Sequence, residues 1–240
     1  MKTNRIFPVV IIAAFSMLLT SCWFMGPSVK GNGNVTEEVR QVEEFDQIKV
    51  TRGMNVYINQ GSPSKVVVIA DNNLHEIITT EVRGRVLTVS VNENIRWAKE
   101  KKVIVTLENL SGVETNSGSN AWSQNQIMSE NMELKSSSGA NLTMEVNAKR
   151  LQANCSSGAN IRISGLAEEA NLEASSGANL KAPDLNVEDC QMRASSGANV
   201  SAKVTGRLEA HASSGGNVVY YGTPGSSEVK TSSGGNVHGK

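Results

Sequence analysis

A short string of the form Ser-Gly-x-Asn recurs seven times between residues 117 and 236, and no other feature limits the fold of this chain as strongly. The steps from one glycine to the next are 21, 19, 19, 20, 18 and 19 residues. A repeat of nearly constant length is the sequence signature of a solenoid, in which each period forms one coil. The glycine and asparagine of each string are Gly118 and Asn120, Gly139 and Asn141, Gly158 and Asn160, Gly177 and Asn179, Gly197 and Asn199, Gly215 and Asn217, and Gly234 and Asn236.

Between the strings, small or apolar residues alternate with polar ones. The positions five residues before the glycines, from the second string onward, are small or apolar, and the positions on either side of them are mostly polar. Alternation with a period of two is typical of a β-strand with one buried face, and the recurrent Gly and Ser residues exclude a helix. This apolar column consists of Leu134, Ala153, Leu172, Met192, Ala210 and Val229.

Together the two patterns predict an all-β chain folded as a parallel β-helix, a solenoid with coils of about 19 residues. Successive coils then stack at about 4.8 Å, the spacing of neighbouring strands, and place like residues above one another. A β-sandwich built from hairpins stays open as an alternative, although it would not require the same corner in every period.

The repeated string itself is interpreted as a structural corner. Glycine adopts backbone angles that are forbidden to other residues, and asparagine tolerates the left-handed region. Stacked asparagine side chains also hydrogen-bond from coil to coil as a ladder. The alternative is that the serines act as nucleophiles or as a row of hydroxyl groups for sugars. A serine nucleophile needs a nearby base, and the three histidines, His75, His211 and His238, do not recur with the serines.

Two cysteines, Cys155 and Cys190, lie inside the repeat region in coils that are two steps apart. Two strand spacings separate them by roughly 10 Å, which exceeds the reach of a disulfide bond. The sequence therefore predicts two free, buried thiols.

The N-terminus resembles the signal of a bacterial lipoprotein. A basic start precedes an apolar run that is too short for an ordinary membrane span, and Leu-Thr-Ser-Cys at its end resembles a lipobox. We expect a signal peptide at residues 1–21, a lipid anchor at Cys22 and a tether over residues 22–38. Such an anchor would hold the protein on the outer membrane, facing the periplasm or the cell surface. A plain cleaved signal with a chance cysteine is the alternative.

Residues 39–240 are predicted to form a single β-helix domain, with irregular coils or a cap over 39–115 and regular coils over 116–240. The string Gly53-Met54-Asn55-Val56 resembles the later corners, which extends the solenoid pattern into the irregular part. Because uncovered coil ends invite edge-to-edge association, the last coil is expected to have either a short protected edge or a homo-oligomer contact through the coil ends. Strands of the irregular part are expected at Phe45–Val50, Met54–Asn59, Lys65–Ala70, Val82–Val91 and Lys102–Leu107, with a helical turn over 72–78.

Three features together resemble a known family. They are the lipobox, the pattern Phe-Asp-x-Ile-x-Val…Gly-x-Asn-Val-x-Ile-x-Gln-Gly over Phe45–Gly61, and the serial Ser-Gly-Ala-Asn coils. The chain is similar, over roughly residues 40–225, to the putative autotransporter adhesin, head GIN domain family, which is common among predicted envelope lipoproteins of Bacteroidetes. The resemblance implies a right-handed parallel β-helix and no established activity. The lipobox implies export by the lipoprotein route.

The charge balance argues against nucleic acid as a partner. The chain has 23 basic and 23 acidic residues, and removal of Lys2 and Arg5 with the signal leaves 21 − 23 = −2, without any basic run. No cofactor or metal is expected. The sequence favours a non-enzymatic, adhesin-like binding or structural module that takes a glycan, an envelope protein or a host protein as its ligand.

Two other functions stay open. One is a periplasm-facing envelope-maintenance protein. The other is a polysaccharide lyase or hydrolase, which needs clustered acids that the scattered aspartates do not provide. Sugar rings stack on exposed aromatic side chains, so the possible ligand contacts are Trp97, Trp122, Tyr220 and Tyr221, with packing in the core or at coil ends as the alternative.

Overall fold

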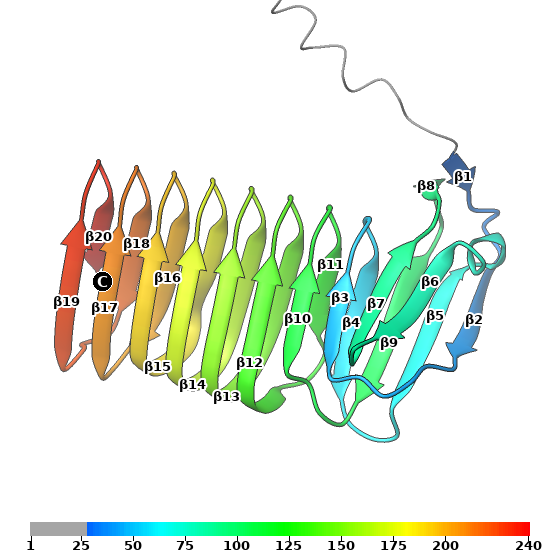
Figure 1. The fold of residues 1–240 in the computed structure, drawn as a ribbon, viewed down its shortest axis with the longest axis horizontal. Coiled ribbons are helices and arrows are strands. Elements are labelled where there is room, and N and C mark those ends of the chain that lie inside the picture. Colours follow the sequence, from blue (N-terminus) through cyan, green and yellow to red (C-terminus); the bar gives the residue numbers. More distant parts are fainter. Residues whose placement is uncertain (1–27) are drawn as a thin grey trace, which may run out of the picture.

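The computed structural model describes residues 28–240, which form an elongated parallel β-solenoid with an antiparallel cap at one end (Figure 1). The predicted all-β parallel β-helix is confirmed. The solenoid strands are β3 (Gln47–Val50), β4 (Asn55–Gln60), β10 (Gly112–Thr115), β11 (Asn120–Ser123), β12 (Ile127–Ser136), β13 (Asn141–Cys155), β14 (Asn160–Ala174), β15 (Asn179–Ala194), β16 (Asn199–Val204), β17 (Arg207–Ala212), β18 (Asn217–Tyr221), β19 (Ser226–Thr231) and β20 (Asn236–Gly239). The cap comprises β1 (Ser28–Lys30), β2 (Val35–Arg40), β5 (Lys65–Asp71), the 3-10 turn η1 (Asn72–Leu74), β6 (Ile78–Arg83), β7 (Val86–Val91), β8 (Asn94–Trp97) and β9 (Lys101–Leu107).

Each coil of the solenoid contributes to two walls. The front wall in Figure 1 contains β3, β10, β12, β17 and β19, and the back wall contains β4, β11, β16, β18 and β20. The long strands β13, β14 and β15 run along the back wall after one corner, bend, and return along the front wall to the next corner. In β13 the bend lies at Lys149 and Arg150, two adjacent exposed residues at which the inward–outward alternation slips by one.

The interior is filled by ladders of like residues, one from each coil. Leu134, Ala153 and Leu172 are fully buried and pair with one another in register. Met192 and Ala210 continue the column. It ends at Val229 of β19, which is 47% exposed. Burial of each large side chain in such a column contributes about 1.5–3 kcal/mol to stability.

The corners take their shape from the Ser-Gly pair of each string. The serine directly before each glycine has a φ between 48° and 54°, and the glycine has a φ between 69° and 75°, so both adopt the left-handed conformation. Asparagine, expected to tolerate this region, instead begins the next strand, as Asn141 does in β13. The left-handed serine is uncommon, because its Cβ crowds the following carbonyl group.

Hydrogen bonds join each corner to the coils on both sides. The Gly158 N–H donates to the Ser176 carbonyl in the next coil at 3.1 Å, and the Asn160 N–H donates to the Ala140 carbonyl in the preceding coil at 2.9 Å. The asparagine side chains add a ladder in which Nδ2 of one residue donates to Oδ1 of the preceding one over 2.9–3.2 Å. This ladder runs through Asn55, Asn120, Asn141, Asn160, Asn179 and Asn199.

The first coil of the solenoid lies inside the segment expected to be irregular. Arg52 and Gly53 have φ values of 54° and 69°, which match the Ser-Gly pairs of the later corners. Beyond this coil, β7 and β6 extend the front wall, and β9, β5 and β2 extend the back wall. The antiparallel pairs among these strands form the cap.

The cap differs from the sequence-based prediction in two places. The segment Val82–Val91, predicted as one strand, lies in the antiparallel pair β6 and β7, because Gly84 and Arg85 with φ values of 56° and 65° form a tight turn. The expected tether over residues 22–38 overlaps β1 and most of β2. These segments are strands because β1 pairs with β8 and β2 pairs with β5. The expected signal peptide and Cys22 lie outside the described residues.

Both cysteines of the solenoid are free and buried, as predicted. Cys155 pairs in register with Ala174 on the front wall, and Cys190 pairs with Ala170 and Leu208 in a different column. Burial raises the pKa of Cys155 to about 11, although backbone hydrogen bonds with Asn179 and Ile161 oppose the effect. Burial raises the pKa of Cys190 to about 12. Both thiols are therefore protonated at neutral pH.

Candidate functional site

The outward side of the front wall carries two grooves that run along the solenoid axis. Because the coils stack in register, each groove is lined by columns that receive one residue from every coil it crosses. Neighbouring members of a column are separated by about 4.8 Å, the strand spacing. We call them the serine groove and the amide groove after the residues that characterise them.

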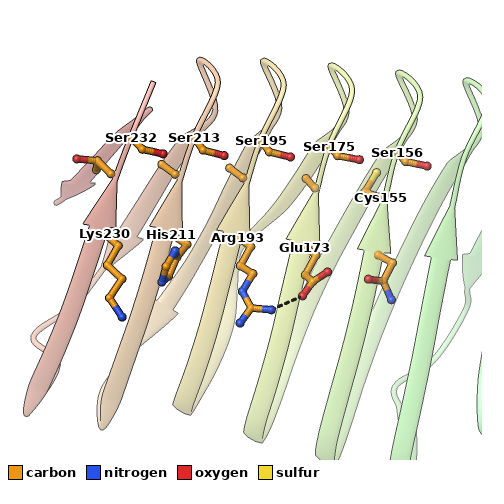
Figure 2. A pocket seen from close by; sticks show the side chains of 15 residues that line it. Cys155, Ser156, Glu173, Ser175, Arg193, Ser195, His211, Ser213, Lys230 and Ser232 are labelled. Atoms are coloured by element: carbon orange, nitrogen blue, oxygen red, sulfur yellow. Dashed lines mark hydrogen bonds and ion pairs between the residues drawn. The ribbon is translucent and has the colours of Figure 1, made fainter. Parts of the chain in front are cut away.

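The serine groove lies where the front wall meets the corners and has a volume of about 590 Å³ (Figure 2). One side is a row of serines, each two residues before the glycine of its corner. The other side is an outward column of the strands, and small buried residues, such as Ala174 and Ala194, form the floor. The serine row consists of Ser156, Ser175, Ser195, Ser213 and Ser232, and the facing column consists of Asn154, Glu173, Arg193, His211 and Lys230.

The serine hydroxyl groups are available to a ligand. The backbone N–H groups of Ser175 and Ser195 are used in the ladder, donating to the Cys155 and Ala174 carbonyls at 3.0 and 3.1 Å. Within residues 28–240, the five hydroxyl groups make no hydrogen bond to another residue, and Figure 2 shows them projecting side by side from successive corners. The row therefore offers a donor and two acceptor positions at each step.

Charge in the serine groove changes along the axis. Arg193 Nη1 lies 3.1 Å from Glu173 Oε1, so these two charges balance one another (Figure 2). Toward β19, His211 and Lys230 follow, and Lys230 forms an ion pair with Glu228 of its own strand. The hydrogen bond with Glu228 and its charge raise the pKa of Lys230, which keeps the ammonium group charged.

The amide groove lies beside the bend of the coils and has a volume of about 570 Å³. Two ordered contacts hold its outer side. Arg150 Nε donates to Asn131 Oδ1 at 2.7 Å, and the Arg207 N–H donates to Asp189 Oδ1 at 3.0 Å. Its central column places the amides Gln152, Asn171 and Gln191 in register between Glu133 and Glu209.

The four aromatic residues predicted as possible contacts lie in three separate places and outside both grooves. Trp97 is 49% exposed in β8 of the cap, where Lys30 Nζ lies 5.6 Å from its ring centroid. Trp122 stacks on Tyr57 with ring centroids 5.0 Å apart, outward on the back wall. Tyr220 and Tyr221 lie in β18, near the opposite end of the solenoid from the cap.

The corner glycines and asparagines predicted from the string lie at the corners described above, and none of them lines the serine groove. The sequence alone leaves a row of hydroxyl groups as an alternative and does not identify its members. The signal that identifies them is the serine two residues before the corner glycine, present from the second string to the seventh. Among residues 28–240, no group of three or more His, Cys, Asp or Glu side chains is arranged to hold a metal ion.

Comparison with known proteins gives a family and a fold. A family described as "Putative auto-transporter adhesin, head GIN domain" matches residues 44–224. A putative adhesin from Bacteroides fragilis is 17% identical, with a TM-score of 0.82 over 89% of this chain and 100% of that chain. A putative adhesin from Parabacteroides merdae is 20% identical, with a TM-score of 0.72 over 90% of this chain and 100% of that one.

A third solved structure carries a different description. It is a putative lipid binding protein from Parabacteroides distasonis, 18% identical, with a TM-score of 0.67 over 89% of this chain and 97% of that chain. At such identities the three structures establish the fold. No curated protein matches the chain.

Proposed function

This chain belongs to the putative auto-transporter adhesin, head GIN domain family, and from that premise we propose that it is a non-enzymatic, adhesin-like binding module of the cell envelope. Its ligand is a linear glycan that lies along the solenoid axis in the serine groove. The observation that carries this proposal is the unbroken row of free serine hydroxyl groups along the groove.

The periodicity of the groove supports a ligand that is itself a repeating chain. A polysaccharide presents hydroxyl groups at each unit, and the row from Ser156 to Ser232 presents hydrogen-bonding partners at each coil. A single contact of this kind contributes about 0.5–1.5 kcal/mol, so useful affinity requires several contacts along the chain. Once one sugar unit is bound, the contacts of neighbouring units in the same chain form intramolecularly, which raises the overall affinity.

The side chains across the groove suit the same chemistry. Asn154 offers an amide, and the balanced Glu173–Arg193 pair offers fixed acceptors and donors without a large net charge. Planar polar groups of these types hydrogen-bond well to sugar hydroxyls. The parallel amide groove adds a second polar surface on the same wall.

The reactive groups of the grooves support binding rather than catalysis. The thiols of Cys155 and Cys190, which lie at the floors of the two grooves, are protonated because burial raises their pKa values. A thiol in that state is a weak nucleophile. The residues facing the serines differ from coil to coil, so no base recurs with the hydroxyl row.

The position of β1 at the cap end supports attachment to a membrane through that end of the solenoid. Strand β1 lies at the cap end, opposite β19 and β20 (Figure 1). A lipid anchor at Cys22, which we propose holds the protein on the outer membrane, would therefore leave the grooves and the far coils extending away from the membrane. Within residues 28–240 there is no helix long and apolar enough to span a membrane.

Removal of the central hydroxyl groups tests this function. The wild-type protein is first screened against linear polysaccharides of microbial envelopes and host surfaces. For the glycan that binds, the variant Ser175→Ala/Ser195→Ala/Ser213→Ala is expected to lose about tenfold or more in affinity, because three hydrogen bonds are lost. Titration calorimetry of both proteins measures the change.

The matched control is Thr143→Ala/Ser201→Ala, which removes two outward hydroxyl groups from the back wall. This control is expected to bind as the wild type does. Equal losses in the two variants, or no binding by the wild type to any linear glycan, would show that the serine groove is not the ligand site.

A further inference from the structure

The end of the solenoid opposite the cap is an open strand edge. The residues of this strand complement those of a second copy of the same strand when the two pair antiparallel. All six residues of β19 are exposed, and Val229, which continues the buried apolar column, is 47% exposed. On its covered side β19 pairs in parallel with β17. Among the described strands, none pairs with its other side. Such an edge is a template for pairing with another chain.

The free hydrogen-bonding groups of this edge can be assigned. The N–H groups of Ser226 and Ser232 donate to carbonyl groups of the preceding coil, Gly206 and Ala212, at 3.3 and 3.0 Å. Because backbone groups point to opposite sides at successive residues of a strand, those of Ser227, Val229 and Thr231 point toward the open edge. Any strand that docks must satisfy these three residues.

We propose that the occupant is a second copy of this chain, with β19 pairing antiparallel to β19 of the partner about a two-fold axis at Val229. This contact goes beyond the proposed glycan site and does not depend on it. In this register Val229 faces its own counterpart, and Ser227 faces Thr231 at both ends, so all three residues that point outward exchange backbone hydrogen bonds. The two exposed valine side chains extend the buried column from one copy into the other.

The charges of Glu228 and Lys230 favour this register over the other registers that pair the outward backbone groups. Centring on Val229 places Glu228 of each copy directly opposite Lys230 of the other, which gives two attractive cross-strand pairs. Within one chain these two side chains already form an ion pair with each other. Registers centred on Ser227 or Thr231 also pair the outward backbone groups of the two strands. They place fewer residues opposite one another, and neither Glu228 nor Lys230 then faces a side chain of opposite charge. An interface in which the same patch serves both copies closes as a dimer and does not grow into a fibre.

The two-fold axis joins the two copies head to head. Since β1 lies at the cap end of each copy, the two β1 strands lie at the far ends of the paired rod. With the anchor proposed at Cys22, the contact would join molecules that extend toward each other from facing surfaces. The front walls of the two copies continue into one another across β19, which lengthens the polar surface.

Charge reversal and its rescue test the proposal. Sedimentation equilibrium of the purified protein is expected to show a monomer–dimer equilibrium. Glu228→Lys makes both cross-strand pairs repulsive and is expected to raise the dimer Kd roughly tenfold or more. The double variant Glu228→Lys/Lys230→Glu restores opposite charges in the same register and is expected to return the Kd to within about threefold of the wild-type value.

The control is Glu133→Lys in β12. Glu133 and Lys135 flank Leu134 as Glu228 and Lys230 flank Val229, and they form the same ion pair, but β10 and β13 cover both sides of β12. This variant is expected to leave the Kd unchanged. A wild-type protein that stays monomeric at high micromolar concentration, a double variant as weak as the single one, or assembly beyond dimers would overturn the proposal.

Discussion

Replacing Gly165 by alanine is expected to destabilise the solenoid by about 3 kcal/mol or more. Gly165 of β14 has a φ of 111°, a conformation that L-residues rarely adopt. A Cβ atom at this position would lie 1.9 Å from the Val146 carbonyl oxygen in the preceding coil. Because that oxygen belongs to the backbone of a paired strand, the coil must shift to make room. Denaturant unfolding followed by circular dichroism measures the loss.

Gly177→Ala is the matched control for this prediction. Gly177 also has a positive φ, of 70°, but a Cβ atom there would meet nothing within 4 Å. Its replacement by alanine is expected to lower the free energy of unfolding by only about 1–2 kcal/mol, because the left-handed conformation is unfavourable for a residue with a Cβ atom. The two variants therefore separate backbone strain from coil stacking. If both lost the same stability, the close approach of β14 to β13 at Gly165 would be disproved.

Replacing Asp71 by alanine is expected to destabilise the cap by about 3–5 kcal/mol, because buried N–H groups lose their acceptor. Asp71 is fully buried, and its carboxylate accepts hydrogen bonds from the backbone N–H groups of Gly33, Glu100 and Lys99 at 2.9, 3.1 and 3.3 Å. It thereby joins the β1–β2 loop and the β8–β9 loop to the end of β5. Hydrogen exchange is expected to increase in the cap strands and to stay slow in β13–β15. The control is Asp184→Ala, at an exposed position.

The same carboxylate predicts an acid-dependent loss of stability. Burial raises the pKa of Asp71, but the hydrogen bonds from Gly33, Glu100 and Lys99 and the charge of Lys99 outweigh it, so the pKa lies below 3.8. A pKa that is lower in the folded state means that the contribution is present above the unfolded pKa and is lost as the pH falls through the folded pKa. The wild type is therefore expected to lose more stability than Asp71→Ala between pH 5 and about pH 2. Parallel acid-unfolding curves for the two proteins would contradict this assignment.

The solenoid could be predicted because its pattern is local and repeated. The alternation around Leu172 identifies the buried face, and the repeat length fixes which residues stack, so the register of Leu151 with Ala170 follows from the sequence alone. The likeness of Gly53-Met54-Asn55 to the later strings correctly indicated a further corner. Each of these inferences needs only residues within one or two periods.

The cap and the grooves could not be predicted in the same way. The pairing of β5 with β9 and β2 joins distant segments that share no repeat, so the sequence does not indicate which strands are neighbours. The left-handed conformation of the corner serines was missed because asparagine is the more common residue there. The serines of the groove, such as Ser175 and Ser195, directly precede these left-handed serines, and the sequence alone does not identify the groove that they line.

The dependence of affinity on ligand length is the most direct test of a groove that binds a linear glycan. Oligosaccharides of increasing length, taken from the glycan that binds best, are titrated into the wild-type protein and into Ser175→Ala/Ser195→Ala/Ser213→Ala. Because the groove repeats its contacts at every coil, wild-type affinity is expected to rise with each added sugar until the chain spans the serine row, and the variant is expected to show a much shallower rise. A monosaccharide that binds as tightly as the longest oligosaccharide would contradict the account.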